Sequence, residues 1–225
     1  MRQGIDSVVP RPSVMNTRQL IVALGTDHKV LPAPANALRR WLIPASVLAG
    51  LALFATAGLR EDLGRVAATP RVLFKWLLAG ALVLSSIGAL LRMARPGTTL
   101  GWWSTALFTV FLTLALGVTA ELLLLPSAQW MEQARGTNAS WCLRMIPMLA
   151  AAPFAATFLA LRTAAPTRPV LAGAMAGLLA GAIGAALYTL HCTDDSPLFV
   201  AIWYALAILG ASGAGAIAGA QWLRW

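Results

Sequence analysis

The chain has 225 residues, of which 59% are hydrophobic and only 11% are charged. An ordinary soluble domain carries roughly 25% charged residues, so this composition, with its mean hydropathy of +0.73, excludes a soluble enzyme, a disordered chain and a nucleic-acid-binding domain. The formal net charge of +9 therefore belongs to the loops of an integral membrane protein, and we expect no direct nucleic-acid partner.

Residues 1–40 form the only sizeable segment expected outside the bilayer, and we interpret them as a cytoplasmic N-terminal segment. An Asn-Thr pair before an apolar run and a glycine after it predict a short helix over about residues 16–25. Leu20, Ile21 and Leu24 would share one face of that helix. Because so short a helix is marginal alone in water, this face either docks into a groove of a partner or lies on the membrane surface.

The rest of the chain, residues 41–225, is predicted to be a membrane domain. A helix needs about 20 apolar residues to cross a hydrocarbon core of about 30 Å, and six stretches meet that length. We therefore expect an all-α fold, a polytopic bundle of six transmembrane helices. Prolines interrupt the fourth stretch and require neighbouring helices to satisfy the carbonyls that they free. The expected spans are residues 41–59, 72–91, 102–125, 143–161, 169–190 and 198–223.

The distribution of basic residues predicts the orientation. With the N-terminus in the cytoplasm, eleven of the 17 lysines and arginines lie on the inner side and six on the outer side. The positive-inside rule favours this arrangement. We expect a multi-pass protein of a bacterial inner membrane with both termini in the cytoplasm.

Two features inside the spans carry structural predictions. Glycines recur at intervals of four in the fifth span and are frequent in the sixth, which predicts close packing of these two helices. Glu121 is the only carboxylate within a span, and such a residue is a candidate proton or ion site. Because it lies near the outer interface, we expect it instead to reach the interface or to bond Arg144, with no charged partner inside another span.

The two cysteines are predicted to lie on one face of the membrane. Cys142 stands at the outer start of the fourth span and Cys192 in the loop between the fifth and sixth. In the orientation above, that face is the periplasmic one, where disulfides persist. A bridge would tie the fourth span to the following hairpin and contribute about 4 kcal/mol. The alternative is two unrelated buried thiols.

His191, Cys192, Asp194 and Asp195 form a compact cluster of candidate metal ligands. With the other cysteine they could hold a thiophilic ion such as zinc, although the spacing fits no established zinc pattern. The alternative is structural, with the two aspartates and Ser196 making the turn that caps the sixth span. The chain has no Cys-x-x-Cys, no intramembrane histidine pair and no nucleotide-binding loop, so we expect no other cofactor and no enzyme.

Three stretches of the chain are distinctive when taken together. They are Met15-Asn-Thr-Arg-Gln-Leu-Ile-Val-Ala-Leu, Trp141-Cys142, and His191-Cys-Thr-Asp-Asp-Ser-Pro-Leu-Phe199 with Trp203-Tyr204. In these stretches the chain resembles the negative regulator of sigma-F family, six-span membrane anti-sigma factors of proteobacteria. The resemblance implies a partner, an extracytoplasmic-function sigma factor held by the N-terminal segment. It also implies that Cys142 and Cys192 are the pair through which oxidative or heavy-metal stress is sensed.

The function expected from the sequence is thus a membrane-bound anti-sigma factor that releases its partner when the cysteine pair changes state. Two other classes of membrane protein are alternatives. A small transporter or channel needs polar residues that converge at mid-membrane, and the first, second, fifth and sixth spans supply almost none. A quinone-linked thiol oxidoreductase needs two cysteine pairs to relay electrons, and the chain has only two cysteines. The sequence leaves the oligomeric state open.

Overall fold

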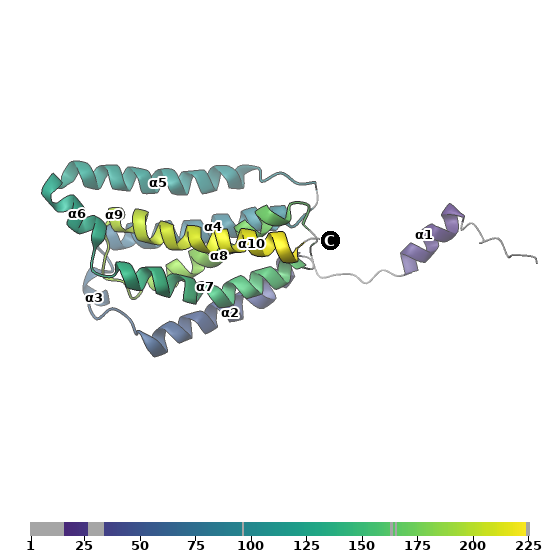
Figure 1. Cartoon of the computed structure of the whole chain (residues 1–225), viewed down its shortest axis with the longest axis horizontal. Helices are drawn as coiled ribbons and strands as arrows, with labels where there is room; N and C mark the ends of the chain where they lie inside the picture. Colours follow the sequence, from purple (N-terminus) through teal and green to yellow (C-terminus); the bar gives the residue numbers. More distant parts are fainter. Residues whose placement is uncertain (1–15, 27–33, 96, 163, 165, 224–225) are drawn as a thin grey trace, which may run out of the picture. The chain divides into compact units, whose positions relative to one another are not determined.

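The computed structural model describes residues 16–26, 34–95, 97–162, 164 and 166–223. The chain divides after residue 32 into two units, which are described separately. Within the described ranges, six helices are long and apolar enough to cross a membrane (Figure 1), which confirms the predicted all-α membrane fold. The helices are α1 (Thr17–Thr26), α2 (Pro34–Thr56), α3 (Leu63–Val66), α4 (Pro70–Met93), α5 (Trp102–Leu124), α6 (Ser127–Arg135), α7 (Ala139–Arg162), α8 (Pro169–Tyr188), α9 (Pro197–Phe199), the π-helix η1 (Val200–Tyr204) and α10 (Ala205–Trp222).

Helix α1 is the described part of the N-terminal unit. Asn16 begins it with a reciprocal pair of bonds, because its Oδ1 accepts from the Arg18 amide at 3.3 Å while its own amide donates to Gln19 Oε1 at 3.2 Å. This is the pattern of a capping box. Leu20 and Ile21 are 43% and 65% exposed. The side chain of Leu24, the third residue of the expected docking face, lies outside the described residues.

Local sequence signals set the ends of the membrane helices. Pro70 and Pro169 stand in the first turns of α4 and α8, where the missing N–H costs nothing. Gly58 ends α2 in the left-handed region, at φ 73°, and its amide donates to the carbonyl of Leu53 at 3.1 Å. Helix α7 contains two prolines yet continues as one helix from residue 139 to 162, with α2 and α8 packed along it.

Helix α8 is the centre of the bundle and packs against α10, α7 and α4. Its glycines allow backbone contact with α10: a Cβ added to Gly177 would lie 2.2 Å from the Ala211 carbonyl oxygen, and one added to Gly173 the same distance from the Gly215 oxygen. This confirms the predicted packing of these two spans. By contrast, Gly213 of α10 has nothing within 4 Å, so not every glycine of the last span serves that contact.

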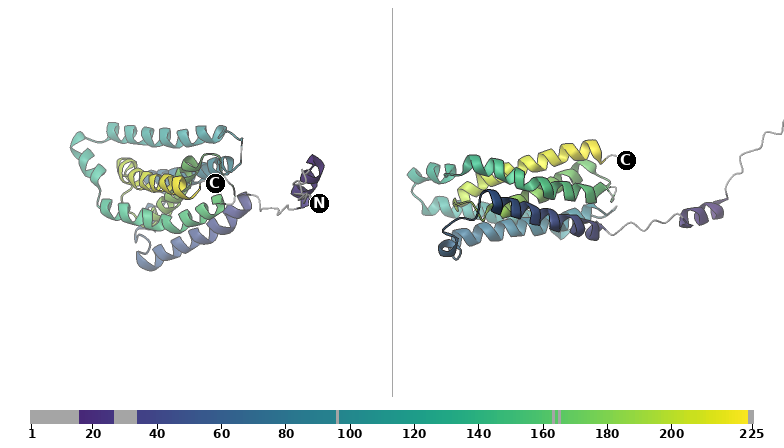
Figure 2. Two further views of the ribbon diagram at one scale, coloured as in Figure 1. Left: turned by 45° about the vertical axis from the view of Figure 1, so that its right-hand side comes forward. Right: turned by 90° about the horizontal axis from the view of Figure 1, so that it is seen from below.

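Helix α5 lies along one side of the bundle (Figures 1 and 2). Only 11% of its most apolar stretch is buried inside the protein, against 61% for α8. Its two buried residues are Val110 and Glu121. At the start of α5, the Trp103 ring covers Gly88 of α4. Most of α5 therefore presents apolar side chains outward, as expected for a helix in lipid.

The bundle has two chemically different ends. One end, here the cysteine end, carries the connections 57–69, 125–138 and 189–196, and the opposite end carries the start of α2 and the finish of α4. Every acidic residue described between residues 34 and 223 belongs to the cysteine end: Glu61, Asp62, Glu121, Glu132, Asp194 and Asp195. At the opposite end, the charged residues within the same described range are all exposed arginines: Arg39, Arg40, Arg92, Arg95, Arg162 and Arg168.

Candidate functional site

The two cysteines lie in one buried cluster at the cysteine end. Cys142, on the first turn of α7, and Cys192, in the connection between α8 and α9, are both free thiols with no exposed surface. The cluster also contains Tyr188, Phe199 and Tyr204. The sequence expectation that both thiols return to the same end of the bundle is therefore met. Two small nucleophiles in an aromatic, water-excluding setting form the first part of a candidate site.

Asp194 joins the cysteine connection to the helix that carries Cys142. Its carboxylate accepts from the amides of Thr137 and Asn138, at 3.1 Å and 2.8 Å, just before α7 begins. A carboxylate at a helix N-terminus satisfies free amides and is favoured by the helix dipole. The residue two positions after Cys192 thus caps the helix on whose first turn Cys142 lies.

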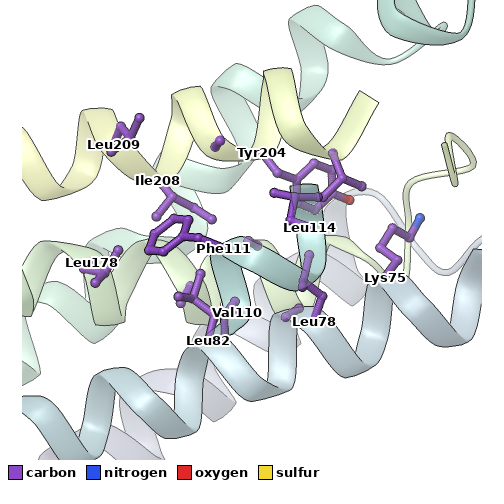
Figure 3. Close-up of a pocket in the computed structure, with 15 residues that line it drawn as sticks. Lys75, Leu78, Leu82, Val110, Phe111, Leu114, Leu178, Tyr204, Ile208 and Leu209 are labelled. Carbon is purple, nitrogen blue, oxygen red and sulfur yellow. The ribbon is translucent and has the colours of Figure 1, made fainter. Parts of the chain in front are cut away.

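Lys75 holds the same connection from α4. Its ammonium group is only 1% exposed, and it donates to the carbonyl oxygens of Cys192 at 3.0 Å and Asp194 at 3.2 Å. It also forms an ion pair with Asp195. Figure 3 shows Lys75 at one end of an apolar cavity of about 80 Å³ between α4, α5, α8 and α10, with its nitrogen turned away from the labelled apolar side chains.

Arg60 holds the connection from the end of α2. Its Nη1 donates to the Cys192 carbonyl at 3.2 Å and to both carboxylate oxygens of Asp195 at 2.9 and 3.0 Å. Its Nε and Nη2 bond both oxygens of Asp62, at 2.6 and 3.0 Å. The carbonyl of Cys192 therefore receives two cationic donors, and buried charge of this kind is stable only when each charge is paired.

These contacts have electrostatic consequences. Burial raises the pKa of the Cys192 thiol, and the nearby Lys75 ammonium acts in the opposite direction. The hydrogen bond to the Arg60 guanidinium lowers the pKa of Asp62. Because only the thiolate is strongly nucleophilic, Cys192 is held mainly as the less reactive thiol at neutral pH.

Three side chains of the expected metal cluster, those of His191, Asp194 and Asp195, have separate partners. The His191 Nδ1 atom lies 3.1 Å from the carbonyl oxygen of Gly58, Asp194 caps α7, and Asp195 pairs with Arg60 and Lys75. Among the residues that the structure describes, no group of three or more histidine, cysteine or carboxylate side chains is arranged to hold a metal ion. The turn expected from Asp194, Asp195 and Ser196 caps the last span through Ser196 alone, which accepts from the Phe199 amide.

Glu121 does not have the partner expected from the sequence. Its Oε2 accepts from Ser196 Oγ at 2.6 Å and from the Leu198 amide at 3.0 Å, and its Oε1 pairs with Arg71 at 3.0 Å. Arg144 instead donates to the carbonyl of Ser140 on its own helix. The expectation was wrong because it assigned a partner by nearness to the interface, whereas the packing of α5 against α9 decides which groups meet.

Lys75 and Arg60 are not among the site residues expected from the sequence, where they belong to the six basic residues of the outer side. Lys75 lies inside the second expected span, within an otherwise apolar run. An ionisable residue in such a run is a signal for a functional or structural site, and that signal was available. Arg60 lies in a connection, where its burial could not be foreseen.

The geometry defines a class: a six-helix membrane protein with two free, buried thiols, one of them in a connection that is held by ion pairs. A family model described as negative regulator of sigma F matches residues 24–225, and the chain belongs to that family. It is 35% identical over 216 residues to a probable anti-sigma-F factor, NrsF, of Azospira oryzae. It is 34% identical over the same length to the anti-sigma-F factor NrsF of Caulobacter vibrioides. Both alignments cover 94% of this chain and 100% of the relative. No solved structure matches the chain significantly.

Proposed function

We propose that this protein is a membrane-bound anti-sigma factor that holds an extracytoplasmic-function sigma factor through its N-terminal segment and releases it when Cys142 and Cys192 change state. The observation that carries the proposal is the family match over most of the chain, together with the two buried thiols at one end of the bundle. The relatives' names supply the anti-sigma activity. We place the cysteine end in the periplasm of a bacterial inner membrane, following the positive-inside rule.

The N-terminal segment supplies the binding half. Leu20 and Ile21 stand exposed on α1, and an exposed apolar face on a short helix suits a groove on a partner protein. Docking would cover sigma-factor surface that RNA polymerase needs. The membrane domain would keep the complex at the inner face of the membrane, on the side of the end opposite the cysteines, where the described charged residues are exposed arginines.

The cysteine pair supplies the sensing half. In the oxidative form of the proposal, the two thiols and one molecule of hydrogen peroxide give one disulfide and two molecules of water. In the heavy-metal form, both thiols lose their protons and bind one thiophilic cation. Either change must alter the affinity of the segment for its partner by a few kcal/mol to change occupancy usefully.

Capture of the sigma factor tests the binding half. The full-length protein is solubilised in detergent and its partners are identified by mass spectrometry, with and without residues 1–33. We expect capture of a sigma factor to be lost in the truncated protein and in the variant Leu20→Asp with Ile21→Asp. Val22→Asp is the matched control, because Val22 lies on the other face of the helix at 61% exposure. Undiminished capture by the double variant would remove the segment from the mechanism.

Release under stress tests the sensing half. Cells that carry the protein are treated with hydrogen peroxide or cadmium, and sigma factor retained on membranes is measured. We expect release from the wild-type protein and retention by the variant Cys142→Ser with Cys192→Ser. Release that is unchanged in this variant would show that the cysteines are not the sensor. A response to cadmium alone would select the metal form over the oxidative form.

A further inference from the structure

The cysteine connection is bonded to the end of α2, the helix that continues into the N-terminal segment. Arg60 follows Thr56, the last residue of α2, after only three residues. Besides its bonds to Cys192 and Asp195, its amide donates to the carbonyl of Leu190 at 3.1 Å. Gly58, which ends α2, lies within hydrogen-bond distance of His191. Contacts on both sides of Cys192 therefore fix the end of α2.

We propose that Arg60 couples Cys192 to the N-terminal segment, so that a change at the thiol reaches the other side of the membrane through α2. This proposal rests on the proposed function and assigns the transmission to one residue and one helix. Arg60 acts through Cys192 and Asp195 and is a positioning residue. Its side chain is 3% exposed, and its guanidinium makes five bonds to these two residues and Asp62.

The two cysteines lie in elements of different size. Cys142 lies within the long helix α7, where its amide donates to the Asn138 carbonyl at 2.8 Å, and α7 is packed along α2 and α8. Cys192 lies in the short connection after α8, where its amide donates to the Tyr188 carbonyl at 3.0 Å but no helix continues through it. A disulfide requires Cα atoms within about 4.4–6.8 Å and a restricted dihedral angle, so closure of the bond would displace the connection rather than α7.

Displacement of the connection would be transmitted to α2 with little loss. The Cys192 carbonyl and the Asp195 carboxylate are held by the same Arg60 guanidinium, and such bonds form at donor–acceptor distances of about 2.7–3.2 Å. Arg60 must therefore follow the connection or lose buried bonds. The link to α2 is short, and α2 continues as one helix from Pro34 to Thr56 through Pro44, so we infer that its other end moves as well.

An insertion separates this coupling from folding. Two glycines placed between Leu59 and Arg60 keep every buried ion pair but lengthen the link to α2. Two glycines placed between Ala67 and Ala68 are the matched control, because they lengthen the same connection beyond Arg60. The two measurements are the oxidation state of the cysteines, by mass-tagging of free thiols, and the sigma factor retained on membranes after hydrogen peroxide.

We expect both insertion variants to hold sigma factor at rest and to oxidise at the wild-type rate. After oxidation, the 59/60 insertion should release roughly tenfold less than wild type, as for loss of a coupling free energy of ordinary size, while the 67/68 insertion releases normally. Normal release by the 59/60 insertion would overturn the proposal. Failure of the 59/60 variant to oxidise would also overturn the proposal, because the link between α2 and Arg60 would then act on the thiols themselves.

Hydrogen exchange separates this inference from the proposed function. It is measured on the α2 backbone of the full-length protein in nanodiscs without sigma factor, before and after oxidation. We expect exchange near the end of α2 to change in the wild type and in the 67/68 insertion, and to stay constant in the 59/60 insertion. Changed exchange without sigma release would contradict the proposed function alone. Sigma release with unchanged α2 exchange would overturn the coupling and leave the proposed function in place.

Discussion

The two ends of the membrane bundle hold their charges in opposite ways. At the cysteine end, Lys75, Arg60 and Glu121 are buried, at 1%, 7% and 5% exposure, and each is paired. At the opposite end, arginines such as Arg92 and Arg95 are exposed, and no ion pair is formed there among the residues between 34 and 223 that the structure describes.

This difference separates two reasons for charge in a membrane protein. Exposed arginines beyond the lipid serve orientation and need no specific partner. Buried ions are costly unless partners are placed accurately, so a cluster of them fixes the positions of the backbone groups that it holds. The cysteine connection is therefore the part of the molecule where small displacements have structural consequences.

The largest expected effect comes from removing the carboxylate between two buried cations. Asp195→Asn removes the counter-charge of Lys75 and one of the two carboxylates that pair with Arg60. Breaking a buried pair costs about 3–5 kcal/mol. We expect a loss of that size in the free energy of unfolding, measured in mixed detergent micelles. Glu61→Gln, at an exposed acid of the same end, should change it little. Equal effects of the two variants would show that the pairing of Asp195 with Lys75 and Arg60 does not stabilise the fold.

Glu121 should give the next largest effect. Glu121→Leu leaves the Ser196 hydroxyl and the Leu198 amide without their acceptor, and unsatisfied buried donors cost about 1–3 kcal/mol each. We expect a loss of about 2 kcal/mol in the free energy of unfolding, at the lower end of the range for two such donors. Glu121→Gln keeps an acceptor oxygen and should recover part of that loss. If the Gln and Leu variants were equally unstable, the ion pair with Arg71 and not the two hydrogen bonds would hold α5.

The fold could be predicted because its signals are local. Apolar length defined the spans, and glycine spacing predicted the contact between α8 and α10, which brings Gly173 and Gly177 against backbone atoms. The placement of Cys142 and Cys192 at one end needs only the number of crossings between them. None of these predictions requires knowledge of which helices are neighbours.

The ion pairs of the site could not be predicted because they depend on neighbours. Arg60 and Asp195 are 135 positions apart in the chain, and Lys75 and Asp195 are 120 apart. Sequence spacing therefore gives no hint of their contact. The error at Glu121 has the same origin, since the choice between Arg144 and Arg71 is made by helix packing. Only the position of Lys75 within an apolar span could have indicated a buried charge.

The reactivity of Cys192 should show the effect of burial on its thiol. Because its pKa is raised, the thiolate fraction at a given pH is lower than for an ordinary cysteine, whose pKa is about 8.5. In the Cys142→Ser variant, the midpoint of the alkylation rate by iodoacetamide against pH should lie above that value. We expect the rate at pH 8 to be lower than that of the unfolded protein. Slow access alone would lower the rate without moving its midpoint, so a midpoint at or below about 8.5 would contradict the raised pKa.

The smallest effect is expected at the opposite end, and it completes the comparison. Arg92→Gln with Arg95→Gln removes two exposed charges that make no ion pair among the described residues. Surface changes away from specific contacts usually stay within about 0.5 kcal/mol. The free energy of unfolding should therefore remain within that range, under the conditions used for Asp195→Asn. A loss above about 1 kcal/mol, outside the usual surface range, would show that these arginines also have specific partners, and the two ends would then differ in degree and not in kind.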